Sequence, residues 1–410
     1  MPLDAQAPPA TRPARPPDSP AAVFAAFLRL GCTSFGGPVA HLGYFRAEFV
    51  ERRRWLDEAG FADIVALCQF LPGPASSQVG VSLGMLRAGL PGGLAAWAGF
   101  TLPSALAMIL FAQGLGHLAD PGHAAWLHGL RIVAVAVVAQ AVRGMAATLC
   151  PDRTRLTLAA ASAILALAVP TALGQIAAIL LGAAIGWRLV APTPPPASGH
   201  LGVALPRALA LGCLAAFLVL LLGLPFLAAL VPSHPLALVS RFYRTGALVF
   251  GGGHVVLPLL QHAVVPPGWI GDDRFLAGYG AVQAVPGPLF TFAAYLGAAM
   301  RPGPSGWLGG ALCLAAIYLP SFLLLIGVLP FWEGLRRRPG VRAALAGINA
   351  AVVGVLLAAL YTPVWTSAIA TPADFALALA AFLLLVLWRL PPWLVVILGA
   401  ATASVLGPLL

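Results

Sequence analysis

Three arginines lie inside or at the edge of apolar runs of the sequence: Arg29, Arg131 and Arg244. An arginine within a membrane span costs at least about 2.5–3.5 kcal/mol on insertion scales, and without an acidic partner it favours a bound anion. Its planar guanidinium suits carboxylates and tetrahedral oxyanions. Nearly all of the 13 acidic residues fall in loops or at segment ends. This charge pattern predicts an anion site; the structural alternative is that Arg29 and Arg244 reach toward an interface.

Glycine runs follow two of these arginines at the same distance. FGGP (residues 35–38) comes after Arg29 and FGGG (residues 250–253) after Arg244. Each glycine costs a helix about 1 kcal/mol relative to alanine, so the runs predict unwound backbone or the close approach of a ligand. Close helix packing through small residues is the alternative. The binding residues predicted here, with the two arginines, are Ser34, Gly36, Gly37, Gly251 and Gly252.

Two proline-glycine-proline breaks are the strongest local signals, in QFLPGP (residues 69–74) and QAVPGP (residues 283–288). Pro72 and Pro286 should stop a helix, and Pro74 and Pro288 should restart one. The amides that follow form a helix N-terminus, which attracts anions. A structural kink without a binding role is the alternative. The predicted ligand-binding residues are Gln69 and Gln283, which are expected to be buried, and Gly73, Ser76, Ser77, Gly287 and Thr291.

Few other side chains are candidates for chemistry. Asp63 is the one acidic residue placed a turn inside an apolar run, where it could pair with Arg29 or relay protons; His41 and His254 are further proton candidates. The five cysteines show no CxxC spacing, and the remaining histidines show no metal-ligand spacing, so neither a metal nor a cofactor is expected. GVSLG (residues 80–84) formally matches GxSxG, but it lies in an apolar run without a preceding strand, so no catalytic residue is predicted.

The elements that must position these residues are apolar helices. The chain is 60% hydrophobic and 9% charged, whereas soluble domains are about 25% charged. High positive charge in short loops indicates membrane orientation and not a nucleic-acid partner. We expect an all-α polytopic membrane protein with about 13 (10–13) transmembrane helices, some broken at Gly and Pro. The apolar segments are 22–43, 61–86, 91–115, 125–147, 156–169, 171–190, 207–231, 237–260, 274–299, 305–329, 343–361, 373–389 and 391–409.

The chain repeats itself. FLRLGCTSFGGPVAHL returns 215 residues later as FYRTGALVFGGGHVVL, and TLPS (101–104) returns as YLPS (318–321). GLRIVAV, from Gly129, likewise returns as GINAAVV, from Gly347. Homologous apolar halves broken at equivalent points predict a transporter with its site between the repeats. The expected division is a disordered tail (1–21), a first repeat (22–190), a linker with an unpaired helix (191–236) and a second repeat (237–410).

The relative orientation of the halves depends on the number of crossings between them. Seven crossings precede the second repeat if every segment crosses, and an odd number makes the halves inverted repeats. If the segments 22–43 and 237–260 both re-enter, six crossings remain and the repeats run parallel. The distribution of arginines does not choose between these two arrangements. The inverted arrangement is the one expected here.

Together, FLRLG, SFGGP and QFLPGP in the first half, with YRTGALVFGGGHVVLP and QAVPGP in the second, resemble the chromate ion transporter family in its long-chain, two-domain form. The resemblance runs from about residue 22 to the C-terminus. It implies a multi-pass protein of the bacterial cytoplasmic membrane that exports chromate, driven by the electrochemical gradient, with halves inserted in opposite orientations. Chromate is similar to sulfate in shape and charge, so the resemblance separates these two anions least well.

The expected function is therefore outward transport of a tetrahedral dianion, chromate, by alternating access, which would confer chromate resistance without enzymatic chemistry. The alternatives are a transporter of sulfate or another small anion, a channel, and an integral membrane hydrolase that uses Ser82. The expected partners are the anion and the lipid bilayer. The sequence leaves the oligomeric state open, a homodimer included.

Overall fold

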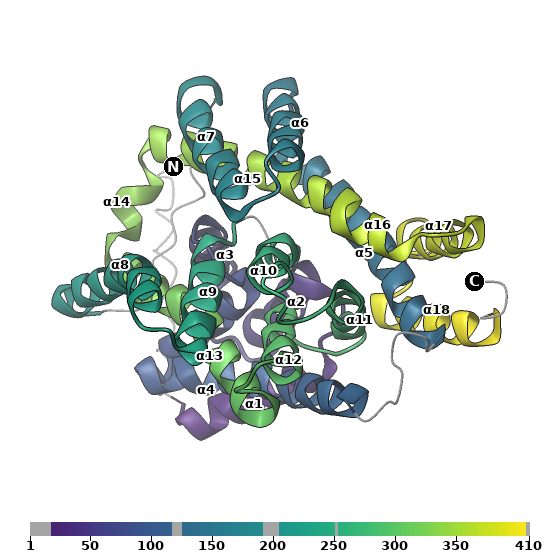
Figure 1. Ribbon diagram of the computed structural model, residues 1–410. Helices are drawn as coiled ribbons and strands as arrows, with labels where there is room; N and C mark the ends of the chain where they lie inside the picture. Colours follow the sequence, from purple (N-terminus) through teal and green to yellow (C-terminus); the bar gives the residue numbers. More distant parts are fainter. Residues whose placement is uncertain (1–17, 117–124, 192–204, 251–252, 407–410) are drawn as a thin grey trace, which may run out of the picture.

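A computed structural model describes residues 18–116, 125–191, 205–250 and 253–406, and these residues form helices and loops without any strand (Figure 1). The all-α prediction is confirmed for them. The first half contains α1 (Pro20–Thr33), α2 (Gly37–Phe45), α3 (Glu58–Phe70), α4 (Ala75–Gly116), α5 (Ala125–Leu149), α6 (Arg153–Ala168) and α7 (Ala172–Leu189). After the unpaired α8 (Arg207–Leu230), the second half contains α9 (His234–Leu248), α10 (Val256–Val264), α11 (Asp272–Val282), α12 (Phe292–Ala299), α13 (Gly306–Val328), α14 (Trp332–Arg336), α15 (Pro339–Ala359), α16 (Thr366–Ala368), α17 (Pro372–Val386) and α18 (Pro392–Leu406).

Within the described ranges, five helical stretches are long and apolar enough to cross a membrane, judged by length and composition. The four segments that the sequence shows to be interrupted by Gly or Pro are instead pairs of short helices: α1 with α2, α3 with the start of α4, α9 with α10, and α11 with α12. The thirteen apolar segments therefore do not correspond to thirteen continuous helices. The five long stretches are Ala75–Gly116, Ala125–Leu149, Arg207–Leu230, Gly306–Arg336 and Pro339–Ala368.

Each pair of short helices folds back on itself. The rings of Phe27 and Phe45 lie 5.5 Å apart, although Phe27 is six residues before the end of α1 and Phe45 is the last residue of α2. If the chain ran straight through as a helix, the helical rise would separate them by about 27 Å. In α9 and α10 the same return is shown by Arg241, whose Nη1 donates to the carbonyl of Ala263 at 2.6 Å. These two segments are hairpins that reverse between α1 and α2 and between α9 and α10.

The proline-glycine-proline breaks are hairpin tips as well. Cys68, near the end of α3, has its Sγ 3.9 Å from the Oγ of Ser82, seven residues into α4. In the second half the hydroxyl of Tyr295, late in α12, donates to the carbonyl of Arg274 at the start of α11 at 2.7 Å. Antiparallel contacts of this kind require the chain to reverse at each break. The structure thus contains four short hairpins, two in each half.

Helix α4 itself reverses at Ala88 and Gly89, whose backbone leaves the helical region. A Cβ added to Gly84 would lie 2.7 Å from the Cβ of Ala96, whereas twelve residues of straight helix span about 18 Å. The first arm of α4 (75–87) therefore belongs to the hairpin with α3, and its second arm (90–116) is the long apolar helix.

The two halves exchange their last helix pairs. In Figure 1, α6 and α7 of the first half stand against α15 of the second, while α17 and α18 of the second half lie along α5 of the first. Glycines permit both contacts, because a Cβ on Gly347 would lie 2.6 Å from the Cα of Gly186, and one on Gly129 would lie 2.7 Å from the Cβ of Ala403. Gly129 and Gly347 open the repeated GLRIVAV and GINAAVV motifs, so the packing is reciprocal.

Replacing Gly347 by alanine should destabilise this exchange, since the added methyl group meets the backbone of α7. Overpacking typically costs about 1–3 kcal/mol, so the melting temperature of the detergent-purified protein should fall by several degrees. Gly212→Ala on α8 is the matched control, because no atom lies within 4 Å of its added Cβ. Equal melting temperatures for the two variants would contradict the close packing at Gly347.

Candidate functional site

The tips of the hairpins bind each other across the two halves. The amide of Gly73, in the first proline-glycine-proline tip, donates to the carbonyl of Val249 at 2.6 Å. The amide of Gly287, in the second such tip, donates to the carbonyl of Ser34 at 2.9 Å. Ser34 and Val249 are equivalent residues of the repeat, each two positions before a glycine run. We call the place where these four tips meet the crossing point.

A second reciprocal contact explains why glycine occupies both tips. Gly73 and Gly287 have φ angles of +121° and +104°, which other residues rarely adopt. A Cβ on Gly73 would lie 2.7 Å from the Oγ of Ser321, and one on Gly287 would lie 2.7 Å from the Oγ of Ser104. Ser104 and Ser321 close the repeated TLPS and YLPS motifs. Each tip therefore packs against the serine of the opposite half.

Helix ends surround the crossing point. In the first half α3 ends at Phe70 and α4 begins at Ala75, and in the second α11 ends at Val282 and a 3-10 turn begins at Leu289. The first amide of α4 that bonds to a backbone carbonyl is that of Gln78, which donates to Pro74, so the three amides before it have no acceptor within the helix. The four prolines between the helices are Pro72, Pro74, Pro286 and Pro288.

A buried histidine links two of these tips. His41 places Nε2 3.2 Å from the carbonyl oxygen of Ser34 and Nδ1 3.3 Å from the Oγ of Ser76. A carbonyl only accepts, so Nε2 carries the proton and Nδ1 accepts from the serine hydroxyl. The carbonyl of Ser34 thus accepts both from His41 and from Gly287 of the other half. This shared acceptor couples the start of α4 to the second-half tip.

Several buried polar atoms near the crossing point have no protein partner. A buried polar group without a hydrogen bond costs about 1–3 kcal/mol, so a cluster of such groups indicates a place that receives a polar ligand. The hydroxyl of Tyr318 lies 3.4 Å from the Oγ of Ser77 and closes one side of the cluster. The atoms without a partner are Ser34 Oγ, Gln78 Oε1, Thr101 Oγ1 and Ser321 Oγ.

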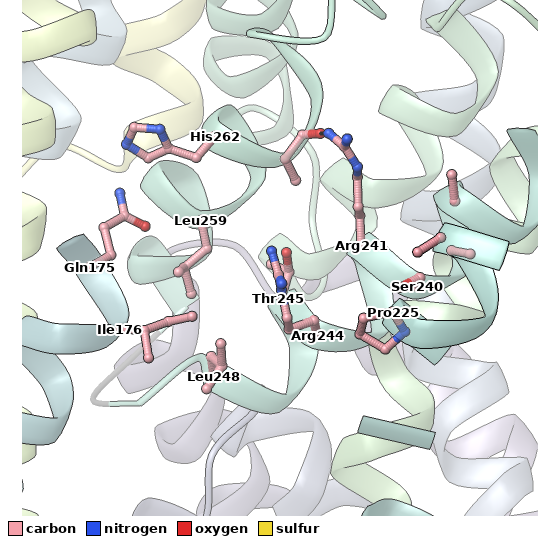
Figure 2. A pocket seen from close by; sticks show the side chains of 14 residues that line it. Gln175, Ile176, Pro225, Ser240, Arg241, Arg244, Thr245, Leu248, Leu259 and His262 are labelled. Atoms are coloured by element: carbon pink, nitrogen blue, oxygen red, sulfur yellow. Dashed lines mark hydrogen bonds between the residues drawn. The ribbon is translucent and has the colours of Figure 1, made fainter. Parts of the chain in front are cut away.

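A cavity of about 440 Å³ lies beside α9, and no acidic residue lines it. Figure 2 shows Arg241, Arg244 and Thr245 on α9, with Gln175 and His262 across the cavity. Arg241 is held by the carbonyl of Ala263 and lies 4.5 Å from the centre of the Trp269 ring. Among the described residues, the guanidinium of Arg244 contacts neither an acidic side chain nor a hydrogen-bond acceptor. The cavity is therefore positive, with one free guanidinium.

The cavity extends along α9 toward the crossing point. Its lining residues on this helix run from Ala237 to Leu248, the residue before Val249, which binds Gly73. Gln175 reaches the cavity from the exchanged helix α7, and its Oε1 is buried without a partner. An anion entering this cavity would meet a guanidinium first and the helix ends at the crossing point next.

Arg29 does not lie beside Arg244, contrary to the expectation that the two arginines share a site. Its side chain is exposed on α1 and does not line the cavity. The physical reason is that α8 packs on α9, where Phe217 contacts Tyr243, and α8 has no counterpart in the first half. The corresponding face of α1 is left uncovered.

Two other expectations were wrong. Gln69 is exposed at the end of α3, while its counterpart Gln283 is half-buried with Nε2 unpartnered. Asp63 does not pair with Arg29, because its Oδ1 accepts from Arg336 at 2.6 Å and from the indole of Trp332 at 3.2 Å.

The remaining predicted residues are distributed as follows. His254 bonds the hydroxyl of Tyr279 at 2.8 Å, and Thr291 donates to the carbonyl of Pro288 within its own turn. The Oγ of Ser82 donates to a carbonyl of its own helix. Gly36 and Gly37 both have positive φ and begin α2. Gly251 and Gly252 lie outside the described residues.

Some polar residues within long apolar runs lie at the site but were not predicted from the sequence. The repeated TLPS and YLPS motifs were a signal for four of them, since polar residues at equivalent points of both halves indicate a contact. Nothing local marked the others, because the elements that surround them come from the opposite half. The residues that were not predicted are Thr101, Ser104, Gln175, Arg241, His262, Tyr318 and Ser321.

Replacing Gly287 by alanine should destabilise the crossing point, through the positive φ and through the contact with Ser104. Such strain is typically about 1–3 kcal/mol, so the melting temperature should fall by several degrees. The double variant Gly287→Ala/Ser104→Gly should recover part of the loss because the close contact is removed. Gly43→Ala, with open space around it, is the control. If the second substitution brings no recovery, the assigned contact is wrong.

Comparison with known proteins agrees with this doubled architecture. A model of the chromate transporter family matches residues 21–187 and 236–404. The chain is 28% identical to a chromate transport protein of Pseudomonas aeruginosa, over 83% of this chain and 80% of that protein. It is 26% identical to a chromate transport protein of Cupriavidus metallidurans, over 94% and 92% of the two chains. A probable chromate transport protein of Synechococcus elongatus is 28% identical over 82% of each chain.

No solved structure matches the chain significantly. The family match covers most of the sequence and occurs twice, once in each half, and it confirms the resemblance carried by the glycine and proline motifs. Together with the long apolar helices, it identifies an integral membrane protein. The chain belongs to the chromate transporter family.

Proposed function

We propose that this protein exports chromate from the bacterial cytoplasm by alternating access and so confers chromate resistance. The observation that carries the proposal is the positive cavity with one unpaired guanidinium, Arg244, which leads to unpaired helix amides at the crossing point. The names of relatives in Pseudomonas aeruginosa and Cupriavidus metallidurans support chromate as the anion. The transporter family supports transport without enzymatic chemistry.

The proposed anion path joins the start of α4 to Arg244 on the outer side of the crossing point. The guanidinium of Arg244 offers two parallel donors to a tetrahedral oxyanion. Thr245 and Gln175 lie beside it in the cavity. Farther along, the first amides of α4 and the hydroxyls of Ser76 and Ser77 can replace the water around the anion. These groups recognise shape and charge, so sulfate is the competing substrate.

The hairpins support an inverted arrangement of the halves. Because α1–α2 and α3 with the first arm of α4 both return to their starting side, neither adds a crossing. The second arm of α4, α5 and α8 each cross once, and α6 with α7 add two crossings or none. Three or five crossings then separate the repeats, which is odd in either case. The parallel alternative required the segment 61–86 to cross, and this segment turns back.

This arrangement also gives a consistent distribution of charge. With the N-terminus in the cytoplasm, Arg131, Arg274 and Arg301 are placed on the opposite face. The positive-inside rule requires an excess of arginine on the cytoplasmic face of a protein in the cytoplasmic membrane. The described arginines placed on the cytoplasmic side are Arg46, Arg52, Arg53, Arg54, Arg87, Arg143, Arg153, Arg155, Arg188, Arg207, Arg336, Arg337, Arg338, Arg342 and Arg389.

Inversion assigns the two equivalent arginines to opposite sides of the crossing point. Arg29 lies four residues before the end of α1, which enters from the cytoplasm, and Arg244 lies four residues before the end of α9, which enters from outside. We propose that Arg29 receives the anion from the cytoplasm and that Arg244 passes it outward as one half moves against the other. An inside-negative potential favours export by about 2.3 kcal/mol per charge per 100 mV.

Arg244→Lys should reduce chromate uptake into everted vesicles by about tenfold or more, because lysine keeps the charge but loses the planar pair of donors. Arg207→Gln, at the exposed start of α8, should transport at the wild-type rate. Excess sulfate added to the wild type measures how far the two anions compete. Normal chromate transport by Arg244→Lys would remove this arginine from the proposed path.

Cysteine labelling tests the inverted arrangement. In a background without the five native cysteines, Pro267→Cys after α10 should react with a membrane-impermeant maleimide on intact cells. Arg337→Cys, which is exposed after α14, should react only after permeabilisation. The positive-inside assignment places these residues on opposite faces. Labelling of both positions on intact cells would exclude the proposed topology.

A further inference from the structure

A chain of charged side chains joins the two halves on the face opposite the N-terminus. It contains His128 and Arg131 on α5 of the first half, and Asp374 on α17 and Asp273 on α11 of the second half. The proposed anion path does not use these residues. They lie around a separate cavity of about 630 Å³, which Arg131 and Asp273 line.

The hydrogen bonds determine where the proton of the imidazole lies. Nη2 of Arg131 is 3.1 Å from Nδ1 of His128, and Nε2 of His128 is 2.7 Å from Oδ1 of Asp374. A guanidinium only donates and a carboxylate only accepts. Nδ1 must therefore accept, and Nε2 must carry the single proton. In this arrangement His128 is neutral.

Hydrogen bonds to the backbone hold Asp374 in this position. Its side chain is fully buried, and its second oxygen accepts from the amides of Ala370 at 3.0 Å and Thr371 at 2.9 Å. The imidazole of His128 therefore lies between a fully buried carboxylate and the guanidinium of Arg131. The other charged groups of the described residues that line this cavity are Asp272, Arg274 and Arg301, all from the second half.

Protonation of Nδ1 would direct a new N–H at the guanidinium of Arg131. Two donors cannot form a hydrogen bond with each other, so Arg131 must move away from His128. This movement breaks the ion pair between Nη1 of Arg131 and Asp273. That ion pair joins α5 to the start of α11, and the tip after α11 carries Gly287, which binds Ser34 at the crossing point. A proton on His128 would thus loosen the hairpin whose tip binds Ser34 at the crossing point.

We propose that His128 is the proton-binding site of the transporter: a proton from the external solution binds Nδ1, separates Arg131 from Asp273 and frees the α11–α12 hairpin to move. This inference rests on the proposed export of an oxyanion. It differs from the proton candidates found in the sequence, since His41, His254 and Asp63 each have partners within the protein interior. Arg131 and Asp273 act as positioning residues in this account.

Everted vesicles loaded with buffers between about pH 5.5 and 8 test the proposal, because their lumen contacts the external face of the protein. Chromate uptake by the wild type should rise several-fold as the lumenal pH falls. His128→Gln keeps a donor for Asp374 but binds no proton, so its rate should stay near the wild-type value at pH 8, within about twofold across the range. His234→Gln, outside the chain of charges, should keep the wild-type profile.

Asp273→Asn provides an independent readout, because it removes the ion pair that the proton is proposed to break. Its rate at pH 8 should match the wild-type rate at low pH, and its profile should be flat. If the melting temperature shows that His128→Gln does not fold, the pH profile of Asp273→Asn by itself tests the role of His128. A wild-type profile in either variant, or a flat profile in the wild type, overturns the role of His128 and leaves chromate export standing. Absence of chromate uptake by the wild type at every pH overturns export itself, and the proton site with it.

Discussion

The architecture depends on two backbone hydrogen bonds that cross between the halves, from Gly73 to Val249 and from Gly287 to Ser34. Each short hairpin leaves open helix ends in an apolar interior, where an unpaired amide or carbonyl costs several kcal/mol. The reciprocal bonds satisfy part of that requirement, and neither half can supply them alone. This explains why the motifs occur twice and why both tips carry glycine, the residue that tolerates the positive φ and the adjacent serine.

The same arrangement concentrates polarity where the halves meet. The first half contributes His41 and Ser76, whereas the equivalent positions of the second half carry Val256 and Phe290. Net positive charge comes instead from the second half, through Arg244 beside the cavity. A site assembled from unlike contributions of two like halves is chemically asymmetric although its backbone is symmetric.

Ion pairs between the halves lie on both sides of the crossing point. Asp63 of α3 binds Arg336 of α14 on one side, and Arg131 of α5 binds Asp273 of α11 on the other. The first pair is buried, so its desolvation makes it costly to break, while Asp273 is largely exposed. The exchanged helix pairs, α6–α7 and α17–α18, keep the halves associated while such contacts change.

Composition and the paired motifs by themselves determined the all-helical class, the family and the positions of the helix breaks. These follow from local chemistry: proline lacks an amide, glycine disfavours helix, and apolar runs of this length need a bilayer. Only the tertiary structure decided that each break is a hairpin tip, that Asp63 pairs with Arg336 and that Arg29 is exposed while Arg244 lines a cavity. A chain reversal and a straight crossing have the same sequence signals. They differ only in contacts such as Phe27 with Phe45, which depend on how distant segments pack.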